Sequence, residues 1–218
     1  MKIVQNLVPA SKYSIKCPYP MTPEFIVVHN TANDASARNE IAYMISNNNQ
    51  VSFHYAIDDK EIVQGIPENR NAWHAGDGAS GPGNRKGIGI EICYSKSGGQ
   101  RFIEAEKLAA KFIAYKLKEK GWGIDRVKKH QDFSGKYCPH RTLDMGWQRF
   151  LDMVQAELSA LKGDDKVEDK NTPSNWAKEA WEWARKEGIT DGTRPKDTMT
   201  REEMVTMLHR YHKKVFPK

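Results

Sequence analysis

Cysteine is scarce in this sequence, with three among 218 residues. An odd number of cysteines cannot all pair within one chain, which argues against a disulfide scaffold and favours synthesis in a reducing compartment. No apolar run approaches the roughly 18 residues that a membrane-spanning helix needs, and residues 1–6 lack the apolar core of a secretory signal. We therefore expect a protein made in the cytoplasm without a standard signal peptide and without membrane insertion.

Positive charge is only slightly in excess. The sequence has 34 lysines and arginines and 28 aspartates and glutamates, which gives a formal net charge of +6. A positive protein favours anionic partners such as nucleic acid, a membrane surface or a cell-wall polymer. Nucleic-acid readers usually concentrate their basic residues on one element, whereas here they are spread along the chain. No nucleic-acid partner is therefore expected. Apolar residues at 39% also exclude wholesale disorder.

The composition changes near residue 162. Residues 162–171 contain one large apolar residue, Val167, among charged and small polar residues, which is typical of an exposed linker. We expect a main domain over residues 1–161 and a small helical module over residues 172–218.

The main domain mixes the two hydrophobic periodicities. Period-two alternation and short apolar runs indicate strands, and apolar residues three and four apart indicate helices. The predicted order is strand, helix, hairpin, strand, helix, loop, helix, which is typical of an α/β domain with a central mixed sheet flanked by helices. The predicted strands are 24–29, 51–57, 61–64 and 87–93, and the predicted helices are 36–47, 102–120 and 147–161.

Three residues form a candidate metal site. His29 ends an apolar strand, and His130 and Cys138 flank a polar loop. Zinc binds imidazole and thiolate, and catalytic zinc keeps three protein ligands with one position open. The residues alone leave the alternative that the histidines are structural and that Cys138 is a small core residue. Cobalt and manganese can also occupy such a site.

Two charged residues are candidates for the chemistry. Glu91 interrupts an isoleucine-rich strand; it either faces solvent or a cationic partner, or lines a cleft and acts as general base. Lys136 lies two residues before Cys138. It is either a solvated loop lysine or a cation that stabilises an oxyanion.

Three further residues are candidates for substrate contact. Phe53 and His54 are neighbours in a predicted strand and point to opposite faces. His54 is favoured as a structural or outer-sphere residue over a direct ligand. His74 lies in the glycine-rich loop 66–86, and long irregular loops in compact domains are usually functional or mobile.

Five motifs occur in a recognisable order: residues 25–32, 53–55, 73–76, 87–91 and 130–139. In this order they resemble the zinc-dependent N-acetylmuramoyl-L-alanine amidases of the type-2 amidase family. The resemblance covers about residues 1–160 and is greatest to catalytic domains of endolysins from phages of Bacillus-like bacteria and to related autolysins.

The resemblance implies a mixed sheet flanked by helices and cleavage of the amide between N-acetylmuramic acid and L-alanine in peptidoglycan. It implies His29, His130 and Cys138 as Zn²⁺ ligands, Glu91 as the base that takes a proton from water activated by zinc, and Lys136 as a catalytic cation. Some members have a catalytic tyrosine where this sequence has Phe53. Since phenylalanine has no hydroxyl, Glu91 is the main candidate base.

The C-terminal module resembles a single S-layer-homology repeat. Its pattern includes Trp176, Gly188-Ile189, and the capping box that begins at Thr200. That family binds secondary cell-wall polymers, usually with three repeats, and here Arg194 stands where an aromatic residue is common. The alternative is a helical hairpin that only packs against the main domain.

The expected protein is a peptidoglycan hydrolase of endolysin type, made in the host cytoplasm and acting on the wall after release. A peptidoglycan-binding protein without catalysis is one alternative. A bacterial autolysin or a muropeptide-recycling amidase is another.

Overall fold

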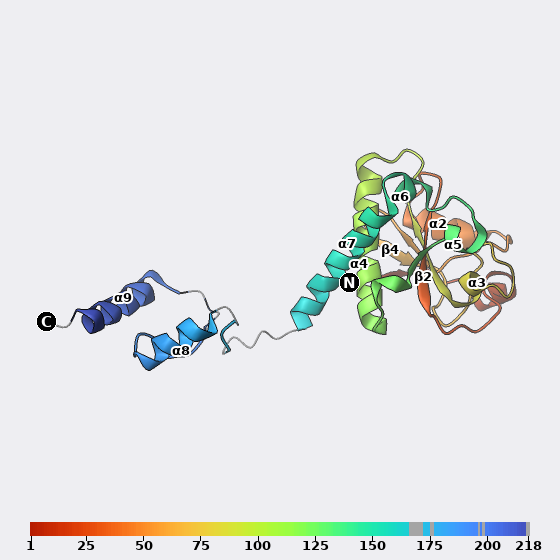
Figure 1. Cartoon of the computed structure of the whole chain (residues 1–218). Coiled ribbons are helices and arrows are strands. Elements are labelled where there is room, and N and C mark those ends of the chain that lie inside the picture. Colours follow the sequence, from red (N-terminus) through yellow and green to blue (C-terminus); the bar gives the residue numbers. More distant parts are fainter. Residues whose placement is uncertain (166–171, 175–176, 196, 198, 217–218) are drawn as a thin grey trace. The chain divides into compact units, whose positions relative to one another are not determined.

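The computed structural model describes residues 1–165, 172–174, 177–195, 197 and 199–216 (Figure 1). The chain divides into two compact units, Met1–Lys162 and Gly163–Lys218. The first contains the sheet and the second is helical. Within the described residues, none of the helices combines the length and apolar character that a membrane span requires.

A six-stranded sheet forms the centre of the first unit, in the order β1-β4-β3-β5-β2-β6. The β3–β4 pair is antiparallel and the other four pairs are parallel. The predicted α/β architecture with a mixed sheet is confirmed. The strands are β1 (Val4–Gln5), β2 (Phe25–Asn30), β3 (Tyr55–Ile57), β4 (Ile62–Gln64), β5 (Gly87–Ile92) and β6 (Val127–Lys129).

Helices flank this sheet. The longest two, α4 and α7, lie side by side (Figure 1) and are joined by Lys118 Nζ donating to Leu161 O at 2.8 Å and by an Arg149–Glu106 ion pair at 2.6 Å. The helices of this unit are α1 (Tyr13–Lys16), α2 (Ala37–Ser46), α3 (Pro82–Lys86), α4 (Gly99–Lys120), α5 (Gln131–Ser134), α6 (His140–Asp144) and α7 (Trp147–Asp165), with 3₁₀ turns at Ala10–Lys12 and Ile124–Arg126.

Local chemistry explains the helix ends. Helix α2 begins after Ser36, whose Oγ accepts the backbone N–H of Asn39. Helix α4 ends at Gly121, which adopts the left-handed conformation at φ +67° that glycine reaches without strain. Inside α4, Phe102, Phe112 and Ile113 are buried in the core against the sheet.

The predicted strand 51–57 is shorter in the structure, where only Tyr55–Ile57 forms β3. The residues before it are extended but bond to different partners: Ser52 N–H donates to Trp73 O and His54 N–H donates to Gly89 O. No single neighbouring strand runs along this segment, so a regular ladder does not form.

The first residues of the predicted linker are helical. Helix α7 continues to Asp165, into the segment 162–171 that was expected to be linker. Charged residues extend an exposed helix end at little cost, and no proline follows until Pro173. The remainder, residues 166–171, lies outside the described residues.

The second unit contains α8 (Lys178–Lys186) and α9 (Arg201–Val215). The capping box is formed: Glu203 N–H donates to Thr200 Oγ1 at 3.1 Å, and Thr200 N–H donates to Glu203 Oε2 at 2.8 Å. Among the described residues of the second unit, Ile189 is the buried apolar one. Trp183 and Leu208 are about half exposed. Trp176 lies outside the described residues.

Candidate active site

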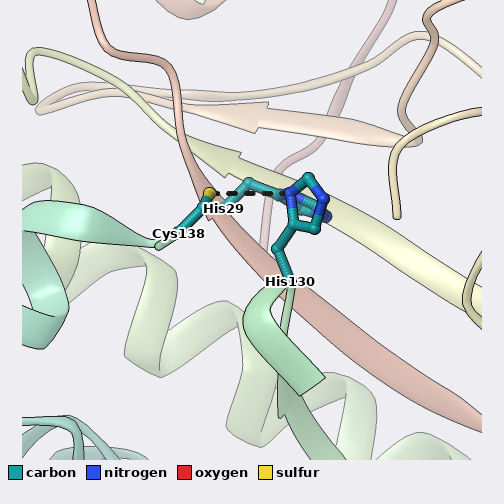
Figure 2. Close-up of side chains that lie close together, drawn as sticks. All are labelled: His29, His130 and Cys138. Carbon is teal, nitrogen blue, oxygen red and sulfur yellow. Dashed lines mark hydrogen bonds between the residues drawn. The ribbon is translucent and has the colours of Figure 1, made fainter. Parts of the chain in front are cut away.

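The sheet topology brings the candidate residues together. Strands β2 and β5 are parallel neighbours, with His29 directly opposite Glu91 in the register. Strand β6 also pairs parallel with β2, and His130 follows it immediately. The carboxyl ends of parallel strands share one edge of a sheet, where α/β proteins commonly place their sites. Cys138 reaches the same edge from the loop after α5 (Figure 2).

His29, His130 and Cys138 form a compact buried cluster. Their candidate ligand atoms all lie within 4.8 Å of one another. His29 Nδ1 lies 3.0 Å from His130 Nδ1 and 3.9 Å from Cys138 Sγ. Tetrahedral zinc would separate two nitrogens by about 3.3 Å and a nitrogen from a sulfur by about 3.6 Å. The donor set and its spacing therefore fit such an ion.

Outer hydrogen bonds determine which ring nitrogens can bind a metal. His74 Nε2 lies 3.2 Å from Gly87 O, and a carbonyl only accepts, so this nitrogen carries the proton. His74 Nδ1 is then an acceptor and takes the N–H of His29 Nε2 at 3.0 Å. His29 Nδ1 is left with a lone pair that faces His130 and Cys138 (Figure 2).

His130 is held in a corresponding way. Its ring forms a hydrogen bond with the Ala75 backbone that raises its pKa, as a carbonyl acceptor does. Because Nδ1 faces His29, Nε2 is the nitrogen left for that bond. Burial nevertheless lowers the pKa of both His29 and His130, and nearby Lys136 lowers them further. Both rings are thus biased to the neutral form that binds metals.

Glu91 is a buried carboxylate with a free oxygen. The residue keeps some exposure, but Oε2 is enclosed and has no hydrogen-bond partner. Burial, and to a lesser extent the negative charge of Glu40, raise the pKa of Glu91 to about 8 against the opposing charge of Lys136. A carboxyl group with a pKa near neutrality and an unoccupied oxygen is suited to proton transfer.

Cys138 and Lys136 complete the electrostatics. Burial and the charge of Glu91 raise the pKa of the Cys138 thiol to about 11, although the Asn30 backbone N–H and Lys136 act in the opposite direction. Lys136 itself is exposed. Its charge acts on His29, His130, Glu91 and Cys138, so it lies close to the whole cluster.

The three candidate substrate contacts are buried. Phe53 is 7% exposed and belongs to the core. His54 accepts Gly89 N–H at Nδ1 and contacts Arg70 O through Nε2, at 3.0 and 2.9 Å. His74 is 7% exposed, and both of its nitrogens are also engaged. Neither histidine has a ring nitrogen free to contact substrate.

Glu40 is a residue that the sequence reasoning missed. It is buried in α2, and its Oε1 has no hydrogen-bond partner. The signal was present, because Glu40 lies in the same helical stripe as Ala37, Ile41 and Met44. A carboxylate in an apolar stripe is unusual and marks a candidate functional group.

Comparisons with known proteins agree on the family. Residues 19–141 match the Amidase_2 family, described as N-acetylmuramoyl-L-alanine amidase. The chain is 54% identical to the N-acetylmuramoyl-L-alanine amidase CwlA of Bacillus subtilis over 215 residues, which is 96% of this chain and 78% of CwlA. It is 61% identical to XlyB of the same species over 158 residues, but this match spans 72% of this chain and half of XlyB.

Solved structures give the same result for the first unit. The structure of PlyL is 55% identical with a TM-score of 0.69, and the match covers 71% of this chain and 97% of PlyL. The catalytic domain of XlyA is 39% identical with a TM-score of 0.64, covering 71% of this chain and 99% of that domain. From its sequence match, its relatives and its mixed sheet, the chain belongs to the Amidase_2 family and is an N-acetylmuramoyl-L-alanine amidase.

Proposed function

We propose that this amidase holds zinc with His29, His130 and Cys138 and uses Glu91 as its base to cleave peptidoglycan at the N-acetylmuramic acid–L-alanine amide. The observation that carries the proposal is the convergence of a deprotonated His29 Nδ1 with His130 Nδ1 and Cys138 Sγ. Two imidazole lone pairs 3.0 Å apart repel each other unless a proton or a cation lies between them.

When bound, zinc supplies a Lewis acid that polarises the substrate carbonyl and makes water more acidic. Glu91 accepts the proton of the attacking water, because its side chain keeps some exposure. Glu91 then gives this proton to the alanine nitrogen as the amide bond breaks. One water is consumed, the lactyl group leaves as a carboxylic acid, and L-alanine gains a free amine.

Lys136 has the second role. Its ammonium group is exposed, and its charge reaches the whole ligand cluster. There it stabilises the negative charge that develops on the carbonyl oxygen. Phe53 contributes no hydroxyl, so the proton transfers are assigned to Glu91 alone.

The test is product analysis on peptidoglycan from a Bacillus-like wall. We expect new alanine amines without new reducing sugar ends, lost with a chelator and restored by zinc. Cys138→Ser should lose both zinc and activity, whereas Cys17→Ala, a buried cysteine outside the cluster, should keep both.

Each alternative gives a different result. Wall binding with neither product identifies a binding protein without catalysis. Reducing ends alone identify a glycosidic bond as the target. Amine release that survives complete zinc removal contradicts the metal assignment and leaves the amidase activity in place.

The biological role that we propose is that of an endolysin, synthesised in the cytoplasm of a Bacillus-like host and acting on the wall after release. It is supported by similarity to a chain described as a mutant endolysin from Bacillus subtilis, 39% identical with a TM-score of 0.64. Expression in a Bacillus host with and without a pore-forming partner tests this role. Lysis that requires the pore supports it, and lysis without the pore favours an autolysin.

For the second unit we propose binding to a secondary cell-wall polymer. A groove of about 780 Å³ lies between α8 and α9, and Trp181, Arg194 and Arg210 contribute to its lining. The lining also includes the carboxylates Asp191, Asp197, Glu202 and Glu203. An aromatic ring together with guanidinium and carboxylate groups can donate to and accept from the hydroxyl groups of a saccharide. This supports the resemblance to an S-layer-homology repeat.

A further inference from the structure

Two neighbouring residues support the metal cluster from behind. His74 accepts the outer N–H of His29 at 3.0 Å. The Ala75 backbone bonds to the ring of His130. His74 and Ala75, here called the support segment, therefore fix the ring orientation of two candidate ligands, since an outer hydrogen bond orients a ligating imidazole.

Asn84 holds the support segment. Its Oδ1 accepts both backbone N–H groups of the segment, His74 N and Ala75 N, each at 2.8 Å. Its Nδ2 donates to Gly78 O at 3.0 Å. Asn84 is 4% exposed, so no water competes for these bonds. One side-chain carbonyl thus fixes two consecutive amides.

Close packing leaves the support segment little other freedom. A Cβ at Gly89 would stand 2.7 Å from the His74 ring, and a Cβ at Gly83 would stand 2.5 Å from Ala75 Cβ. The segment is therefore pressed against β5 and α3, where only glycine leaves room. Asp77 completes the arrangement, because its carboxylate accepts Gly83 N–H at 2.6 Å and Asn84 N–H at 3.2 Å.

We propose that Asn84 is a positioning residue of the metal centre, which orients His29 and His130 together by holding the support segment between them. The inference rests on the proposed metal site. The side-chain hydrogen bonds of Asn84 go to His74, Ala75 and Gly78, so its action on the candidate ligands passes through the support segment.

The test compares zinc affinity in three variants with that of the wild-type chain, measured by competition with a chromophoric chelator. Asn84→Ala removes the shared acceptor and should weaken zinc binding about tenfold, the low end for outer-sphere partners. Asn84→Asp keeps an acceptor oxygen and should stay within about threefold of wild type. Asn71→Ala is the matched control, a buried asparagine whose Oδ1 accepts Tyr19 N–H away from the cluster.

The readouts separate positioning from general stability. We expect Asn71→Ala to lower the melting temperature of the metal-free protein but to keep wild-type zinc affinity. Asn84→Ala should also change the absorption spectrum of bound Co²⁺, because the ligand rings lose their fixed orientation. Equal zinc affinity in Asn84→Ala and wild type, or equal loss in Asn84→Ala and Asn71→Ala, would overturn the proposal.

Two outcomes remain decisive if Asn84→Ala does not fold. A tenfold loss of zinc affinity in Asn84→Asp then overturns the inference, and wild-type affinity with an unchanged Co²⁺ spectrum supports it. A wild-type chain that binds no zinc instead contradicts the proposed metal site itself. The wild-type measurement therefore distinguishes the two failures.

Discussion

At the residue scale, Glu91 is held where its charge is unfavourable in the metal-free protein. Burial and the charge of Glu40 raise its pKa to about 8, from its ordinary value of 4.5. The folded state therefore binds this proton more tightly than the unfolded state does. Protonated Glu91 therefore contributes to the stability of the folded state. This contribution is complete below about pH 4.5 and is lost as the pH rises through about 8.

Glu91→Gln should remove this dependence. At pH 5 the metal-free variant and wild type should be equally stable, because both side chains are neutral. At pH 9 the variant should be more stable by roughly 1–3 kcal/mol, a value discounted for the partial exposure of the residue. Amidase activity should fall about 10²- to 10⁴-fold, as for loss of a general base.

Denaturant unfolding with chelator present, at pH 5 and pH 9, measures the stability difference. Glu24→Gln is a suitable control, since that carboxylate is exposed and pairs with Lys86 on the surface. A Glu91→Gln variant that loses stability above pH 8 as steeply as wild type would show that another group is responsible.

The sequence could point to single residues but not to their mutual hydrogen bonds. His29, His130, Cys138 and Glu91 were candidates because their types and positions at strand ends and loops are unusual. The role of Asn84 was invisible, because a buried asparagine and a loop asparagine look alike until Oδ1 is seen to accept two amides. Which nitrogen of His29 is free follows only from the contact with His74.

At the element scale, a buried ion cluster ties α4 to the segment after β4. Glu68 accepts Lys116 Nζ at 2.9 Å, Lys120 Nζ at 2.7 Å and the Tyr55 hydroxyl at 2.8 Å. Burial alone would raise the pKa of Glu68, but the hydrogen bonds from Lys120, Lys116 and Tyr55 lower it to about 2. The stability from this carboxylate is present above pH 4.5 and is lost as the pH falls through about 2.

The free energy of unfolding of Glu68→Gln should therefore depend less on pH in the acid range than that of wild type. Wild type loses up to about 3 kcal/mol from this group between pH 4.5 and pH 2. The variant should start about 3 kcal/mol less stable at neutral pH, because Lys116 and Lys120 lose the negative charge of Glu68 and Lys116 keeps only its pair with Glu119 at 3.0 Å. Urea unfolding between pH 2 and pH 7 measures both effects.

The control for this prediction is Glu104→Gln on the same helix, where the Lys107–Glu104 pair is exposed. It should change stability by less than about 1 kcal/mol at every pH. If wild type and Glu68→Gln lost the same amount of stability between pH 4.5 and pH 2, the role assigned to the cluster would be contradicted.

Elements with a strong period were predicted, and elements defined by their neighbours were not. Helices α2, α4 and α7 carry apolar stripes, and β5 alternates, so their positions were confirmed with small shifts. Strands β1 and β6 have two and three residues and exist only because β4 and β2 offer a free edge. No local pattern encodes such pairing.

At the scale of the whole molecule, the two units allow a division of labour. The first unit contains the ligand cluster and Glu91, and the second contains the groove between α8 and α9. The catalytic domain of PlyG has been solved separately and is 53% identical, covering 72% of this chain. The first unit is therefore expected to fold alone.

A chain truncated after residue 165 should keep its turnover on soluble muropeptides within about twofold, because the proposed zinc ligands and the proposed base Glu91 all precede that point. Its binding to intact walls should weaken at least about tenfold if the second unit is a wall-binding module, a difference of about 1.4 kcal/mol. Co-sedimentation with purified walls measures the binding, and amine release measures the turnover. Equal wall binding by both chains would contradict the assignment of residues 172–218.

The burial of all three cysteines has a consequence for handling and durability. Cys17, Cys93 and Cys138 are free and enclosed, and burial raises the pKa of each thiol. Oxidants and alkylating agents attack the exposed thiolate, and these three buried thiols offer none in the metal-free structure. If the proposed site binds zinc, a chelated sample left in air should therefore take up zinc again, and the protein should withstand an oxidising medium without a disulfide.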